Sequence, residues 1–273
     1  MAKTILDKPK PCFVPPPGTC DVHCHVYADD PRFLDHRGDR LLTVHRALGV
    51  ERAVIVQANP ESRAVTLAAL ALAGGRYRGL AVVDDGTSEA ELAALHTAGI
   101  RGARFPFTAR HGGTPDLAAM LRLIERIKPM GWHVDFLIGP EDIRAHLDFI
   151  RAISIPVVID HMGRTDAAAG LDDPAFKQLL ELAKRDHIWI KLSGADRISA
   201  SGPPFHDALP YIHALLAAAP SRVLWGTDWP HPNNRFNPDV RDLVDLIPLI
   251  APDEADRQRL LVDNPARLYG FTP

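Results

Sequence analysis

Eight short runs of β-branched and apolar residues, separated by longer Ala- and Leu-rich stretches, constrain the fold of this sequence more than any other feature. The short runs predict strands, and the longer stretches, whose apolar residues recur at helical spacing, predict helices. The predicted strands cover residues 20–26, 52–59, 78–84, 99–107, 132–139, 155–162, 188–194 and 223–229. The predicted helices cover residues 41–48, 61–74, 88–98, 115–130, 140–152, 174–186, 207–219 and 239–250, with a closing segment near 253–261.

Strands that alternate with helices predict parallel βαβ units. Runs such as 53–56 and 157–159 are apolar throughout, as expected of strands buried on both faces. A single (β/α)8 TIM barrel over residues 20–273 is the simplest interpretation, preceded by a proline-rich, extended arm at 1–19. A doubly wound sheet is the alternative. The first predicted strand–helix turn lacks a G-x-G-x-x-G loop, which disfavours the nucleotide-binding version of that sheet.

Composition narrows the functional classes. The formal net charge of the 273 residues is −3, whereas an electrostatic nucleic-acid binder usually carries a basic stripe. No apolar run reaches the ~18 residues that a membrane span requires, and the first residues contain no apolar core of a secretory signal. Three cysteines do not make a disulfide framework. We therefore expect a cytoplasmic protein with a small-molecule partner, without nucleic acid or membrane, and leave its oligomeric state open.

Chemically capable side chains gather where the predicted strands end, which is where a barrel carries its active site. His23 and His25 lie on the first strand, and alternation places them on one face, with Cys20, Val22 and Cys24 on the other. His161 lies at the end of the sixth predicted strand and Asp228 at the end of the eighth. A lone histidine is often a satisfied core residue, and a lone aspartate often caps a turn. Four such residues at strand ends favour a catalytic site.

Arginines form a second group of candidates. Arg104 is near the end of the fourth strand, Arg110 lies in the loop that follows, and Arg197 comes after the seventh strand. Guanidinium groups are always charged and hold carboxylates in bidentate geometry. These three arginines therefore predict a binding site for a small anion. Cys24 has no evident base beside it, which argues against thiol chemistry.

The motifs that carry these residues resemble those of the amidohydrolase superfamily. They are Asp-Val-His-Cys-His at 21–25, Ile-Asp-His-Met-Gly-Arg at 159–164, Trp-Gly-Thr-Asp-Trp-Pro-His-Pro at 225–232 and Asn-Pro-Ala-Arg-Leu-Tyr-Gly at 264–270. The likeness runs from about Pro15 to Gly270. Within the superfamily, Arg104, Arg110 and Arg197 make the chain most similar to the 2-pyrone-4,6-dicarboxylate lactonases.

This resemblance implies a carboxylic-ester hydrolase that opens an anionic lactone, 2-pyrone-4,6-dicarboxylate or a close relative, in the catabolism of lignin-derived aromatic acids. It implies catalysis without a metal: His23, His25 and His161 polarise the carbonyl, and Asp228 activates water. The three arginines would hold the substrate carboxylates. Two departures concern the substrate. The stretch up to Leu41 supplies no counterpart to one tyrosine of that family, and Leu137 stands where another is expected. Asp135 would disfavour a carboxylate if it pointed inward.

Two alternatives remain open. The same four residues, His23, His25, His161 and Asp228, would suit a mononuclear zinc enzyme of this superfamily, either a hydrolase of muconolactones or sugar lactones or a decarboxylase. A barrel without activity, serving as a binding protein, is the third interpretation. It gives no reason for these residues to collect at strand ends.

Overall fold

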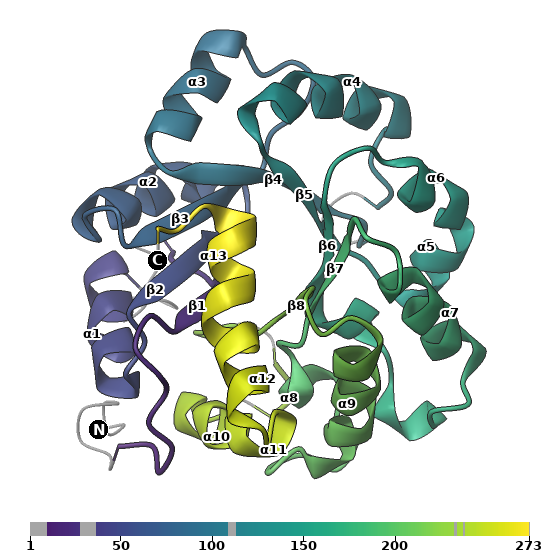
Figure 1. Cartoon of the computed structure of the whole chain (residues 1–273). Helices are drawn as coiled ribbons and strands as arrows, with labels where there is room; N and C mark the ends of the chain where they lie inside the picture. Colours follow the sequence, from purple (N-terminus) through teal and green to yellow (C-terminus); the bar gives the residue numbers. More distant parts are fainter. Residues whose placement is uncertain (1–9, 28–36, 109–112, 232–233, 237, 273) are drawn as a thin grey trace.

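A computed structural model of the chain describes residues 10–27, 37–108, 113–231, 234–236 and 238–272. Its eight parallel strands, one for each predicted run, follow one another in sequence order around a barrel (Figure 1). This confirms the predicted (β/α)8 class. The strands are β1 (Cys20–Cys24), β2 (Arg52–Val56), β3 (Tyr77–Ala81), β4 (Ile100–Pro106), β5 (His133–Leu137), β6 (Val157–Ile159), β7 (Ile188–Lys191) and β8 (Val223–Leu224).

The helices surround the strands, and the last of them lies across one end of the barrel (Figure 1). They are α1 (Gly38–Leu48), α2 (Arg63–Leu72), α3 (Glu89–Thr97), α4 (Leu117–Ile127), α5 (Pro140–Ala145), α6 (Leu147–Ala152), α7 (Pro174–Ala183), α8 (Ala195–Ile198), α9 (Leu209–Ala218), α10 (Val240–Asp245), α11 (Ile247–Ile250), α12 (Glu254–Gln258) and α13 (Asn264–Tyr269). Each predicted helix has a counterpart, but two are divided. His146 leaves helical geometry at φ −115° between α5 and α6. Pro248, which has no N–H to donate, lies in the first turn of α11.

The barrel closes between β1 and the segment after β8. The backbone N–H of Val22 donates to the carbonyl of Trp225 at 3.0 Å, and that of His25 donates to Trp229 at 2.8 Å. Between them, Asp228 donates to the carbonyl of His23 at 2.7 Å. We call this junction the seam. It holds two of the predicted site segments side by side.

One expectation about β1 is wrong. Cys20 and Val22 lie in the barrel interior, whereas Cys24 packs in the apolar layer between strands and helices. The cause is a β-bulge, because the register with β2 shifts between Asp21 and Cys24. A bulge adds a residue to one strand and re-aims the side chains beyond it.

The end of the barrel at the amino ends of the strands is filled by apolar side chains and closed by α13, the yellow helix in Figure 1. Tyr269 of α13 and Phe271 pack there against residues of β1, β2, β3, β6, β7 and β8. The ring of Tyr269 lies 5.1 Å from the ring of His133 at the start of β5. Chemistry is therefore confined to the other end.

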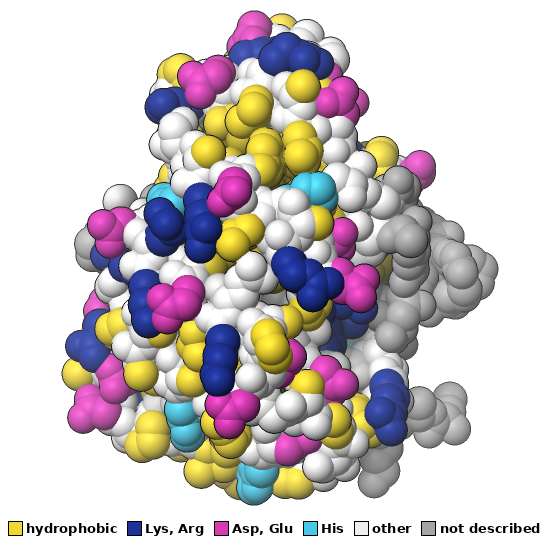
Figure 2. Space-filling model, turned by 90° about the vertical axis from the view of Figure 1, so that its right-hand side faces the viewer, with side chains coloured by type: hydrophobic (Ala, Val, Ile, Leu, Met, Phe, Trp, Pro, Cys, Tyr) yellow, Lys and Arg dark blue, Asp and Glu magenta, His cyan; other side chains and the backbone are white. Residues whose placement is uncertain are grey.

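On the face that Figure 2 shows, acidic and basic side chains are interspersed, and neither sign of charge dominates. None of the described helices has the length and apolar character to cross a bilayer. Of the predicted arm, residues 1–9 lie outside the described part of the chain. Its later residues run along the barrel, where the N–H of Phe13 donates to Asp245 at 2.8 Å.

Candidate active site

Three histidines converge at the carboxyl ends of the strands. The ring of His23 lies 5.0 Å from that of His25 and 4.4 Å from that of His161. The Nε2 atoms of His23 and His25 are 3.2 Å apart. All three side chains are buried. The structure therefore brings together three residues that the sequence places on two distant strands.

Asp228 faces this group from across the seam. Its Oδ1 atom lies 3.3 Å from Nε2 of His25 and 3.6 Å from Nε2 of His23. Its Oδ2 atom lies 3.9 Å from Nε2 of His161 and forms an ion pair with Arg197. Although Asp228 is fully buried, Oδ1 has no hydrogen-bond partner. This oxygen is available to accept a proton.

The backbone around Asp228 is held by Asp21 of β1. The Asp21 carboxylate accepts hydrogen bonds from the N–H of Thr227 at 2.9 Å and from the N–H of His23 at 3.0 Å. The side chain of Thr227 bonds to the same carboxylate. A side chain at Gly226 would approach the His23 nitrogen to 2.7 Å, so only glycine allows this contact. Asp228 itself has φ 59°, a region that Asp and Asn enter more readily than most residues.

His161 lies in a tight turn rather than on a strand. β6 ends at Ile159, and residues 160–164 form a tight turn in which the backbone of His161 is left-handed, with φ 49°. Its Nδ1 lies 3.0 Å from the hydroxyl of Ser193. Gly194 makes room for the ring, because a Cβ there would come within 3.0 Å of the His161 Cβ. The turn thus aims Nε2 toward Asp228.

Two of the predicted substrate-binding arginines contact carboxylates of the protein itself. Arg197 is about a quarter exposed and pairs with Asp228. Arg104 is buried, donates to the carbonyl of Gln57 at 3.2 Å and lies 3.5 Å from Oδ2 of Asp160. Arg110 lies outside the described residues. Arg104 and Arg197 are therefore each one carboxylate away from His23.

A buried charged cluster below the histidines was not predicted from the sequence. The Lys191 ammonium on β7 lies 2.6 Å from Oδ2 of Asp135 and 2.9 Å from Oδ1 of Asp160. Nδ1 of His23 is 3.3 Å from Lys191 Nζ and 3.2 Å from Asp160 Oδ1. Asp135 does point inward, but Lys191 neutralises it. The available signal was one lysine at the end of a strand that otherwise reads Ile-Trp-Ile.

The electrostatics of the site follow from burial and these pairs. Burial raises the pKa of Asp228, but His161 and Arg197 lower it by a larger amount. The net pKa of Asp228 is therefore well below the usual range. Burial lowers the pKa of His23 to about 3. Burial also lowers the pKa of Lys191, but Asp135 and Asp160 outweigh it, and the net pKa is raised. At neutral pH, Asp228 is ionised, His23 is neutral and Lys191 is charged.

A second aspartate lies on the other side of Arg197. Asp196 is buried, and burial followed by the charge of Asp228 raises its pKa to about 7. Its Oδ2 lies 3.9 Å from Nδ1 of His231, whose two ring nitrogens have no hydrogen-bond partner. This pair borders the site, and the sequence placed His231 only near its rim.

The donor set has the spacing that a metal ion requires. His23, His161 and Asp228 each offer a ligand atom, and these atoms lie within 4.8 Å of one another. The free Oδ1 of Asp228 is a suitable oxygen ligand. A second buried group with such spacing, Asp21, Cys24 and His45, is already bonded internally, because Asp21 binds His45 and Thr227.

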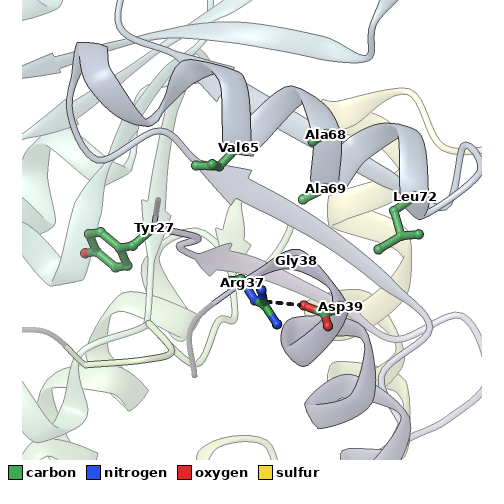
Figure 3. Close-up of a pocket in the computed structure, with 8 residues that line it drawn as sticks. All are labelled: Tyr27, Arg37, Gly38, Asp39, Val65, Ala68, Ala69 and Leu72. Carbon is green, nitrogen blue, oxygen red and sulfur yellow. Dashed lines mark ion pairs between the residues drawn. The ribbon is translucent and has the colours of Figure 1, made fainter. Parts of the chain in front are cut away.

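Two cavities lie near the site. One of about 440 Å³ opens beyond the carboxyl ends of β3 and β4, with Arg104 and Asp84 in its wall. The other, of about 380 Å³, lies between α1 and α2 and is lined by Tyr27, Arg37, Gly38, Asp39, Val65, Ala68, Ala69 and Leu72 (Figure 3). His23, His25, His161 and Asp228 line neither cavity. Only the first is in contact with a predicted substrate-binding residue.

The chain is similar to known proteins over most of its length. Residues 20–271 match the model of a family described as amidohydrolase. The chain is 38% identical to a 4-sulfomuconolactone hydrolase of Rhizobium radiobacter, over 94% of this chain and 92% of that protein. It is also 38% identical to a 2-pyrone-4,6-dicarboxylate hydrolase of Comamonas testosteroni, over 95% and 92%. A crystal structure from Pseudomonas putida, of a protein proposed to be a 2-pyrone-4,6-dicarboxylic acid hydrolase, superposes with a TM-score of 0.82 at 31% identity, covering 94% of this chain and 98% of that one.

Proposed function

The chain belongs to the amidohydrolase family, and from that premise we propose that it hydrolyses the ester bond of a small anionic lactone. Relatives at 38% identity over nearly their whole length hydrolyse lactones that carry carboxylate or sulfonate groups. The observation that carries the proposal is the free, ionised Oδ1 of Asp228, which faces three histidines inside the barrel.

Asp228 is the proposed general base. Water attacks the lactone carbonyl, and Oδ1 of Asp228 takes the proton that the water loses. Negative charge then develops on the carbonyl oxygen, where N–H groups of His23 and His161 stabilise it, and each such donor contributes roughly 10²–10³ in rate. The Nδ1 of His25 bonds to the carbonyl of Val56 instead. The ring C–O bond breaks, and the released oxygen takes the proton that Asp228 holds, which restores the carboxylate. The product is an open chain with one more carboxylate.

The arginines are the proposed binding groups for the substrate's own anions. Arg104 lies in the wall of the 440 Å³ cavity, and Arg197 is partly exposed beside Asp228. We extend the same role to Arg110. Anion binding fixes the orientation of the lactone, which converts binding energy into rate.

Substrate choice within this class is the next question. A purified enzyme should be assayed by absorbance against 2-pyrone-4,6-dicarboxylate, 4-sulfomuconolactone and an uncharged pyrone of similar ring size. We expect turnover of at least one anionic lactone and little turnover of the uncharged one. An enzyme that prefers the uncharged pyrone contradicts the proposed role of the arginines.

A zinc-dependent lactonase is the second candidate, favoured by the spacing of His23, His161 and Asp228. These residues, with His25, would hold the ion. A bound zinc supplies polarisation of the carbonyl and acidification of water. Elemental analysis of active protein decides between the candidates. Stoichiometric zinc whose removal by a chelator abolishes activity supports this one, and full activity without metal supports the first.

A further inference from the structure

The buried ammonium of Lys191 contacts a histidine of the proposed site but has no place in the chemistry described so far. It is fully buried and has three acceptors around it: Asp135 Oδ2 at 2.6 Å, Asp160 Oδ1 at 2.9 Å and His23 Nδ1 at 3.3 Å. A lysine ammonium has three protons and accepts nothing. The hydrogen bond to His23 therefore requires a lone pair on Nδ1.

The contact between His25 and His23 also requires the proton of His23 on Nε2. Nδ1 of His25 lies 2.7 Å from the carbonyl oxygen of Val56. A carbonyl only accepts, so His25 carries its proton on Nδ1, and in the neutral ring Nε2 is bare. Nε2 of His23 lies 3.2 Å away. That contact is a hydrogen bond only if His23 carries its proton on Nε2.

The opposite tautomer of His23 fails at both ends. With the proton on Nδ1, His23 would turn an N–H toward the Lys191 ammonium at 3.3 Å. Two bare Nε2 atoms would then face each other at 3.2 Å, with the ionised Oδ1 of Asp228 beside them. Nδ1 lies 3.2 Å from Oδ1 of Asp160, but that oxygen has no hydrogen-bond partner, so the contact lacks the geometry of a hydrogen bond. The Nε2–H form satisfies both contacts of the His23 ring, to Lys191 and to His25.

We propose that Lys191 is a positioning residue, which fixes the proton of His23 on Nε2 and so turns that ring into a hydrogen-bond donor for the lactone carbonyl. The role toward the lactone carbonyl rests on the proposed function, whereas the tautomer of His23 does not. An N–H at Nε2 polarises a carbonyl, whereas a metal ion requires a lone pair there. The lysine thus biases the site toward the first of the two candidate functions.

The tautomer can be measured without any substrate. In protein labelled with ¹⁵N-histidine, long-range ¹⁵N–¹H correlation spectra distinguish a protonated ring nitrogen from a bare one. The His23 signals are those that disappear in His23→Gln. We expect a protonated Nε2 and a bare Nδ1 in the parent protein. A protonated Nδ1 in active enzyme overturns the proposal and leaves the lactonase function standing. A protonated Nε2 in a protein that hydrolyses no lactone overturns the function and leaves the tautomer standing.

Variants of Lys191 test the cause. Lys191→Met removes all three donors from a side chain of similar length, so the His23 proton should move to Nδ1, toward Asp160. We expect kcat to fall about 10²–10³-fold, as for loss of one oxyanion donor, with a much smaller change in KM. Lys191→Gln keeps an N–H donor and should retain the tautomer and part of kcat.

Val158→Ala is the matched control. Val158 lies in the same barrel interior, two residues before Asp160, and its truncation perturbs packing without touching the charged cluster. It should keep both the tautomer and kcat near those of the parent. A folded Lys191→Met protein with an unchanged tautomer overturns the proposal. If that variant does not fold, the spectrum of the parent protein decides alone.

Discussion

The two ends of the barrel interior are equally buried and chemically opposite. At the amino ends of the strands, Val22, Val158 and Tyr269 belong to an apolar cluster that α13 closes. At the carboxyl ends, buried side chains are charged, and Lys191 and Arg104 oppose Asp135 and Asp160. The difference shows that a buried position in this barrel can hold either an apolar or a charged side chain. What makes charges acceptable at one end is that cations and carboxylates are matched and in contact.

The comparison also separates stability from chemistry. The apolar end contributes by excluding water from hydrocarbon surface, at about 25 cal/mol per Å². The charged end contributes less to stability, because desolvation offsets the attraction between buried charges. Variants at the charged end should therefore act on turnover, and variants at the apolar end on folding alone.

The largest effect is expected at Asp228. Asp228→Asn keeps the shape of the side chain but cannot accept a proton, so kcat should fall at least about 10³-fold, within the range ascribed to general-base catalysis. Steady-state kinetics, with circular dichroism to confirm folding, measures this. Asp196→Asn is the matched control, because Asp196 is also buried near Arg197 but has a pKa raised to about 7. Activity of Asp228→Asn within a few-fold of the parent removes Asp228 from the base role.

Arg104→Met should act on binding more than on turnover. Loss of a charge-assisted hydrogen bond costs about 1.5–3 kcal/mol, which corresponds to an increase in KM of roughly ten- to a hundredfold. The increase should vanish with an uncharged lactone. Arg101→Met on the same strand is the control, because Arg101 bonds to the carbonyls of His96 and Ile100 instead. An unchanged KM for the anionic lactone in Arg104→Met separates Arg104 from the substrate.

His133 is a polar residue at the apolar end, and it should make the protein sensitive to acid. Burial lowers its pKa to about 3, against 6.5 in the unfolded chain. Between those values the unfolded state binds a proton that the folded state does not, so stability falls as the pH falls. His133→Leu should reduce the loss of unfolding free energy between pH 6.5 and 5 by about 2 kcal/mol. Urea denaturation at both pH values measures it, and equal losses in the two proteins contradict the prediction.

The smallest effect is expected at Tyr269. Its hydroxyl is buried without a hydrogen-bond partner, and an unsatisfied polar group destabilises the fold. Tyr269→Phe should raise the free energy of unfolding by up to about 1 kcal/mol and leave kcat unchanged. Thermal denaturation and a lactone assay measure the two quantities. A drop in kcat in a stable Tyr269→Phe protein contradicts the expectation that variants at the apolar end act on folding alone.

The fold followed from the sequence because its signals are local. Each strand is a short apolar run, and the alternation with helices leaves few topologies, so the eight strands and the positions of His23 and Asp228 at their ends were predictable. The bulge in β1 was not, because it arises from pairing with β2 and moves Cys24 out of the barrel.

The charged cluster escaped prediction for a similar reason. Lys191 and Asp135 lie on different strands, 56 positions apart, and the residues next to each of them do not predict the pairing. The pairing of Arg197 with Asp228 likewise depends on how α8 and the segment after β8 fold over the barrel. Sequence identifies which residues can do chemistry, and the closed barrel decides which of them hold one another.

The seam gives the site an order of assembly in time. Asp21, beside the first histidine, and Thr227, beside the aspartate, lie 206 positions apart. A ribosome that adds about 5–20 residues per second needs roughly 10–40 s to make the intervening chain. During that interval β1 has only β2 as a partner, and no amino-terminal fragment that ends before Thr227 contains both halves of the site. The enzyme is thus silent throughout its own synthesis until the last strand joins the first.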